Sequence, residues 1–162
     1  MIKKLSFILV TVFIFSSEPA EAIFTDRVEV ENKYIGVGIT IGRSIGLSFK
    51  KWLDVNVAIN GDIAWSTVKQ DEINLRIQYL IHNLTEYEID DIPLSSYAGG
   101  GTRLKLTGSG KDNRMGIRGT VGTNYIFYPV PVEVFLEASP IFDLVPETTL
   151  SFDLNIGFHY YF

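Results

Sequence analysis

The chain contains no cysteine among its 162 residues. It therefore forms no disulfide bond, although an exported compartment would permit one, and it has no cysteine that could carry a lipid anchor. Histidine is also scarce, with only His82 and His159. We therefore expect stability to come from packing and from a closed ladder of backbone hydrogen bonds.

The sequence has no hydrophobic run long enough for a membrane-spanning helix. Its best candidate, residues 5–15, spans eleven residues and includes a serine and a threonine, whereas a spanning helix needs ~20 apolar residues. Two lysines precede this run and the small-residue stretch Ala20–Ala22 follows it, an order typical of a secretory signal peptide. We predict a signal peptide at 1–22, cleaved near Ala22, and one domain at 23–162.

Basic charge is not in excess, since Lys and Arg number 14 against 19 Asp and Glu, for a net charge of −5. Nucleic-acid-binding proteins concentrate Lys and Arg on one face, so we expect no nucleic-acid partner. No cluster of histidine and carboxylate residues has the spacing of metal ligands. The glycine-containing stretches lack the context of a dinucleotide or phosphate-binding loop. We therefore predict no cofactor.

What the sequence does contain is a two-residue alternation, most regular in its last stretch, 149–162. From Leu150 to Phe162 every second residue is apolar, and most of the residues between them are polar or small. This pattern predicts a strand with one apolar and one polar face. Its length fits the roughly 9–11 residues that a tilted strand needs to cross a bilayer.

The same alternation recurs in further stretches separated by turns rich in glycine, proline and polar residues. The predicted strands lie at 34–41, 44–50, 55–65, 73–82, 96–106, 115–127, 130–139 and 149–162. We expect a loop at 83–94 and a turn at 140–147. An even number of strands joined by short hairpins, without a long helical pattern, predicts an all-β fold. The expected architecture is an eight-stranded antiparallel up-and-down transmembrane β-barrel.

Alternation alone does not distinguish this barrel from a soluble, lipocalin-like one, because the two differ only in which face points outward. The polar phase mixes glycines with long charged side chains, and such a mixture of small and large residues fills a narrow barrel interior. The apolar phase carries aromatic residues near strand ends, as membrane girdles do, and we expect Lys51 and Trp52 at such a girdle. A soluble periplasmic ligand binder is the alternative fold.

Charged residues of the polar phase are expected to line the lumen. They are Lys50, Asp62, Arg76, Arg103, Lys105, Arg118, Glu133, Glu137 and Asp153. Unpaired charge away from water is costly, so we expect paired networks that plug the barrel. An eight-stranded barrel is just wide enough to be filled by its own side chains. A narrow channel for ions or small solutes is the alternative function.

A lipid-modifying enzyme is a third alternative, since such chemistry usually needs a histidine near a nucleophile and a carboxylate. His159 lies near Ser151 and Asp153 in the sequence, but residues six to eight apart on a strand are ~20–27 Å apart. We interpret both histidines as lumen-filling. We predict no catalytic residue and no enzymatic activity.

The stretch Pro131–Pro140 and the last strand with its aromatic end carry a family likeness. They resemble small outer-membrane β-barrel proteins of Gram-negative bacteria, the OmpA-transmembrane-like and OmpX-like class. The resemblance implies a position among outer-membrane lipids and insertion by the barrel-assembly machinery, which would read the last strand through Phe158, Tyr160 and Phe162. We predict a structural or interaction role in the cell envelope. The turns here are short, which disfavours an adhesin.

Overall fold

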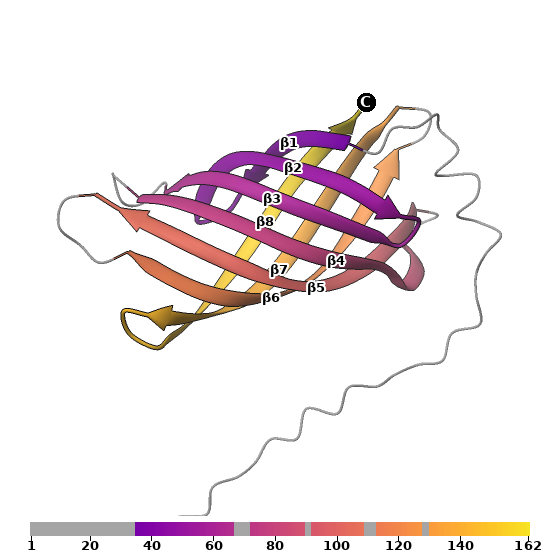
Figure 1. Cartoon of the computed structure of the whole chain (residues 1–162). Coiled ribbons are helices and arrows are strands. Elements are labelled where there is room, and N and C mark those ends of the chain that lie inside the picture. Colours follow the sequence, from indigo (N-terminus) through magenta and orange to yellow (C-terminus); the bar gives the residue numbers. More distant parts are fainter. Residues whose placement is uncertain (1–34, 67–71, 90–91, 109–112, 128–129) are drawn as a thin grey trace, which may run out of the picture.

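The chain folds into eight strands that close into a barrel. The computed structural model describes residues 35–66, 72–89, 92–108, 113–127 and 130–162. The strands are β1 (Ile35–Ile41), β2 (Ser44–Asp54), β3 (Val57–Ser66), β4 (Glu72–Ile89), β5 (Ile92–Thr107), β6 (Arg114–Phe127), β7 (Val132–Val145) and β8 (Thr149–Tyr161). Each strand pairs antiparallel with the next and β8 pairs with β1 (Figure 1). The predicted all-β, eight-stranded up-and-down barrel is confirmed.

The part of the chain that the structure describes contains no helix long and apolar enough to cross a membrane. The predicted signal peptide at 1–22, with its cleavage near Ala22, lies outside the described residues.

The alternating apolar and polar positions of the sequence form the outer and inner faces of the barrel wall. Large apolar side chains from every strand are exposed on the outside, among them Ile77, at 57%, and Leu154, at 58%. The inward positions are buried and mostly polar or charged, such as Arg76 and Glu137. A soluble barrel requires the opposite, an apolar centre and a polar outside. The soluble alternative therefore does not fit this structure, whose faces are those of a transmembrane barrel.

The loop predicted at 83–94 is wrong, because β4 and β5 continue as a paired hairpin to Ile89 and Ile92. The register shifts between His82 and Glu86, and Asn83 has a φ of 62°. A bulge inserts residues into one strand and interrupts the alternation, which explains why the sequence shows no clear period here. Asn83 also links β4 to the turn between β2 and β3, because its Nδ2 donates a hydrogen bond to Oδ1 of Asn56 in that turn, at 2.6 Å.

The turn predicted at 140–147 is also wrong, because β7 continues to Val145. Proline lacks the N–H that a strand ladder needs, and this rule suggested a break. In the structure Pro140 pairs with Phe152 of β8. On the other side of β7, Ile141 and Ala138 pair with residues of β6 but Pro140 does not. The proline interrupts only one of its two ladders. The alternation therefore continues and points Asp143, which is 1% exposed, into the lumen.

Candidate functional site

The lumen is the site where the charged side chains gather. The structure places Lys50, Asp62, Arg76, Arg103, Arg118, Glu133 and Glu137 among the buried residues, with Lys105 and Asp153 partly buried. Each of them takes part in an ion pair with another strand. All of them except Lys105, which pairs with Glu72, fall together with neighbouring residues into two groups defined by contact. The terminal cluster is Ser48, Lys50, Asn124, Glu133, His159 and Tyr161; the arginine cluster is Asp62, Arg76, Arg103, Arg118, Glu137, Asp143 and Asp153.

Glu133 is the centre of the terminal cluster. Its Oε1 accepts hydrogen bonds from Lys50 Nζ and Asn124 Nδ2, each at 2.7 Å. Its Oε2 contacts His159 Nδ1 at 3.0 Å and accepts a hydrogen bond from the hydroxyl of Tyr161. The partners come from β2, β6 and β8, while Glu133 itself is on β7 and is 0% exposed. One carboxylate therefore holds four strands together through charge-assisted hydrogen bonds.

An aromatic layer adjoins this cluster. The His82 ring lies 4.5 Å from the Trp52 ring and 4.8 Å from the Tyr97 ring, between centroids. The Lys50 ammonium lies 4.6 Å from the centre of Trp52, a cation–π distance. The expectation that Trp52 joins an outer girdle is therefore wrong. Trp52 shares the inward phase of β2 with Lys50, and only Lys51 points outward.

Ser48, His159 and Glu133 have the spacing of a nucleophile, a base and an orienting acid. Ser48 Oγ lies 2.8 Å from His159 Nε2, and His159 Nδ1 lies 3.0 Å from Glu133. The sequence did not indicate this trio, since Ser151 and Asp153 were the neighbours weighed for His159. However, Ser48 is 0% exposed and Phe135 stacks on the His159 ring at 4.9 Å. No substrate atom reaches the hydroxyl in this conformation.

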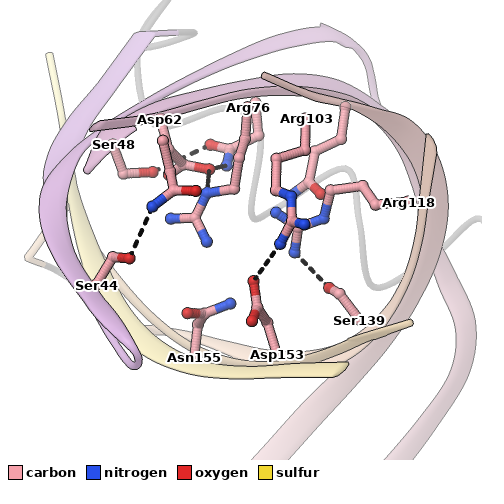
Figure 2. A network of polar contacts seen from close by, with 12 residues as sticks. Ser44, Ser48, Asp62, Arg76, Arg103, Arg118, Ser139, Asp153 and Asn155 are labelled. Atoms are coloured by element: carbon pink, nitrogen blue, oxygen red, sulfur yellow. Dashed lines mark hydrogen bonds and ion pairs between the residues drawn. The ribbon is translucent and has the colours of Figure 1, made fainter. Parts of the chain in front are cut away.

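The arginine cluster places three guanidinium groups together on adjacent strands. Arg76 of β4 lies directly opposite Arg103 of β5, and Arg118 follows on β6 (Figure 2). Like charges directly opposite each other destabilise a sheet unless other groups compensate them. The compensating carboxylates come from the other strands of the barrel, chiefly β7 and β8. The three arginines of β4, β5 and β6 therefore lie between Asp62 of β3 on one side and the carboxylates of β7 and β8 on the other.

The ion pairs across this lumen are close. Arg103 Nη2 donates to both Asp143 oxygens, at 2.6 and 2.7 Å, and Arg103 Nη1 lies 4.0 Å from Asp153. Arg118 Nη2 donates to Glu137 at 3.1 Å and also to the hydroxyl of Ser139 (Figure 2). Such pairing makes buried charge tolerable and fills the barrel centre with protein atoms.

Asp143 and Glu72 are lumenal charges that the sequence interpretation missed. Asp143 was hidden by the turn assigned around Pro140. Glu72 pairs with Lys105 at 2.8 Å and precedes the predicted start of the fourth strand by one residue. Its even position matches the inward phase of Asn74 and Arg76, so extending the alternation by one residue would have found it.

Some donors of the arginine cluster are buried without a hydrogen-bond partner. They include Nη2 of Arg76 and both Nε and Nη1 of Arg118, in side chains that are almost fully buried. Ordered water is the usual partner of such groups when a polar cavity has room for it. In the part of the chain that the structure describes, no group of three or more His, Cys, Asp or Glu residues is arranged to hold a metal ion.

The comparisons with known proteins concern the fold. No protein-family model matches the chain, and no curated protein matches its sequence. The N-terminal β-barrel domain of Pseudomonas aeruginosa OprF is similar with a TM-score of 0.58 and 12% identity, over 79% of this chain and 95% of that chain. A de novo designed transmembrane β-barrel is similar with a TM-score of 0.53 and 13% identity, over 79% of this chain and 94% of that chain. The chain therefore has the fold of a small transmembrane β-barrel.

Proposed function

We propose that this chain is an integral outer-membrane protein of a Gram-negative bacterium with a structural or interaction role in the cell envelope. The observation that carries the proposal is the apolar outer face, to which all eight strands contribute, around an ion-paired interior. A spanning structure must satisfy its backbone polar groups internally, and a closed barrel does so. The proposed signal peptide at 1–22 supplies the export route, and outer-membrane lipids would then contact the outer face.

Heat-modifiable gel migration tests this proposal. The protein is expressed in a Gram-negative host, outer membranes are purified, and the extract is run on a gel with and without boiling. We expect the protein in this fraction, with a faster compact band before boiling, and an N-terminus at Ile23 by intact mass. Recovery in the soluble periplasmic fraction would refute the membrane position, and a retained residue 1–22 segment would refute only the cleavage.

A narrow channel is the second candidate. The unpartnered donors of Arg76 and Arg118 favour it, because water bound to them would give the lumen centre a hydrated path. The close pairs around Arg103 and Glu133 favour a plugged lumen instead. Planar-bilayer recordings of the refolded barrel separate the two, since a plugged lumen gives no discrete conductance steps.

We propose that the protein is not an enzyme, although Ser48 contacts His159. Because Ser48 is 0% exposed, we expect a fluorophosphonate probe to leave the folded barrel unmodified. Ser48→Ala should lower the free energy of unfolding by about 1 kcal/mol, the usual contribution of one hydrogen bond. Mass spectrometry after incubation checks the first result and urea titration the second. Modification at Ser48 that disappears in His159→Ala would contradict the non-enzymatic assignment.

The final strand is proposed as the signal for the barrel-assembly machinery, through the outward side chains Phe158, Tyr160 and Phe162. All three are exposed large hydrophobic residues; Phe158 and Tyr160 lie at the end of β8 and Phe162 follows it. We expect deletion of Phe162 to reduce the compact, heat-modifiable band in outer membranes several-fold. Leu150→Ala is the matched control, because Leu150 is an exposed outward residue at the other end of the same strand. Equal assembly of both variants would argue against the signal.

A further inference from the structure

The hydroxyl of Ser48 lies between two polar partners in the lumen. It donates a hydrogen bond to Oδ1 of Asn60 at 3.3 Å, and it lies 2.8 Å from Nε2 of His159. The other end of the Asn60 amide fixes its orientation, because Nδ2 donates to a carboxylate oxygen of Asp62, which can only accept. Oδ1 of Asn60 therefore faces Ser48. A serine hydroxyl has one proton, so Ser48 donates either to Asn60 or to His159.

These contacts determine which nitrogens of the His159 ring carry a proton. When Ser48 donates to Asn60, Nε2 of His159 must be the donor in the 2.8 Å contact with the Ser48 oxygen. Nδ1 lies 3.0 Å from Oε2 of Glu133, and an ionised carboxylate also only accepts. Both nitrogens then carry a proton, and the ring is a cation. A neutral ring would take the Ser48 donor away from Asn60, which is 3% exposed, and lost hydrogen bonds are costly at such buried sites.

The groups around His159 include both favourable and opposing partners for a cation. Phe135 stacks on the ring at 4.9 Å between centroids, a cation–π distance, and Glu133 of β7 supplies the negative charge. Lys50 of β2 opposes a second cation because it also contacts Glu133. However, the Lys50 ammonium lies 4.6 Å from the centre of the Trp52 ring, so Glu133 is not its sole partner. The other ionisable groups of this layer are Tyr161 on β8, His82 on β4 and Tyr97 on β5.

The charges in the lumen leave room for one more cation. Among the described residues, the lumenal side chains that are buried or partly buried include one more carboxylate than basic groups. The carboxylates are Asp62, Glu72, Glu133, Glu137, Asp143 and Asp153, and the basic groups are Lys50, Arg76, Arg103, Lys105 and Arg118. Arg114 lies 3.7 Å from Asp143, but its side chain is 45% exposed, so water screens its charge. A cationic His159 makes the two sets equal.

We propose that the terminal cluster binds a proton, held on the ring of His159, and that this proton directs the Ser48 hydroxyl toward Asn60. His159 is then an imidazolium cation in the folded barrel at neutral pH. Loss of the proton turns the Ser48 hydroxyl toward Nε2 and removes the donor from Asn60. A cationic ring also has no lone pair to take a proton from Ser48, as the activation of a nucleophile requires.

The bound proton connects the two clusters of the lumen. Through Ser48, the terminal cluster reaches Asn60, whose Nδ2 donates to Asp62 at 3.3 Å. Asp62 in turn pairs with Arg76 at 3.4 Å (Figure 2). When the Ser48 hydroxyl turns away from Asn60, this connection is broken at one hydrogen bond. His159 is therefore a proton-dependent link between β8 and β3.

Heteronuclear NMR of the imidazole nitrogens tests the proposal. The mature chain is labelled at histidine, refolded in detergent micelles and measured at neutral pH, where an unperturbed histidine is mostly neutral. The chain has only two histidines, and His82→Phe, which keeps a ring between Trp52 and Tyr97, assigns the remaining signals to His159. We expect a proton on both nitrogens of His159 in the folded barrel and a mostly neutral ring in urea. A folded barrel in which one nitrogen of His159 lacks a proton overturns the proposal.

Asn60→Ala tests whether the Ser48 hydroxyl is the cause. Without the Asn60 acceptor this hydroxyl is free to donate to Nε2, so the ratio of neutral to cationic His159 should rise about tenfold. Asn155→Ala is the matched control, because Asn155 is a lumenal asparagine of similar burial that donates to Glu137 in the arginine cluster. It should leave the ratio unchanged. Equal ratios in the two variants overturn the role of Asn60, and the spectrum of the parent protein decides the proton itself should Asn60→Ala fail to fold.

Discussion

Gly38→Ala is expected to destabilise the closed barrel strongly, at the seam between β1 and β8. Gly38 points into the lumen on β1 and lies opposite His159. A Cβ at this position would lie 1.6 Å from the carbonyl oxygen of Phe158 and 2.9 Å from the Cα of His159. Both atoms belong to the backbone, so no side chain can rotate away to make room. The two strands must separate, and overpacking of this kind costs about 3 kcal/mol or more.

Urea unfolding in detergent micelles, followed by tryptophan fluorescence, measures this loss. The matched control is Gly61→Ala on β3, because Gly61 points outward and its nearest foreign atom, the carbonyl oxygen of Arg76, is 3.7 Å from the added Cβ. Both variants exchange glycine for alanine within a strand, so their difference isolates the close approach. We expect Gly61→Ala to stay within about 0.5 kcal/mol of the parent protein. Equal stability of the two variants would contradict the tight seam.

The fold could be predicted because the two-residue period is local. Each residue of a strand points to the face opposite to its neighbours. The even positions of β8, from Leu150 to Tyr160, therefore predict an outward face without knowledge of the partner strands. The exceptions are also local in origin. The bulge at Asn83 breaks the two-residue period. Pro140 lacks a backbone N–H, but this affects only one of the two hydrogen-bond ladders of β7, because Pro140 still pairs with β8. A single sequence does not tell which ladder a proline interrupts.

The lumenal residues could be predicted from phase, but their partners could not. Lys50 and Glu133 are 83 positions apart, and Ser48 and His159 are 111 apart. Their meeting depends on the stagger between strands and on the closure of β1 onto β8, and no local pattern carries this information. Trp52 shows a different error. Its even position on β2 already indicates the lumen, but the expectation of an aromatic girdle took precedence.

Glu133→Ala is expected to destabilise the barrel more than any other change in the terminal cluster. Glu133 is 0% exposed and accepts four donors, including the ammonium of Lys50, which is itself only 3% exposed. Without the carboxylate this ammonium remains buried with no opposite charge. Removing one partner of a buried ion pair costs about 3–5 kcal/mol. Glu147→Ala is the matched control, because Glu147 is exposed in the turn between β7 and β8.

A double-mutant cycle separates the unpaired charge from the lost hydrogen bonds. Glu133→Gln keeps the side-chain shape but leaves Lys50 without a carboxylate, and Lys50→Met removes the charge. If the buried ammonium is the main penalty, the double variant should be more stable than Glu133→Gln alone, with a coupling of about 1–3 kcal/mol from urea titration. Strictly additive losses would mean that Asn124, His159 and Tyr161 carry the effect. The role of Glu133 would then be to orient these three donors and not to neutralise Lys50.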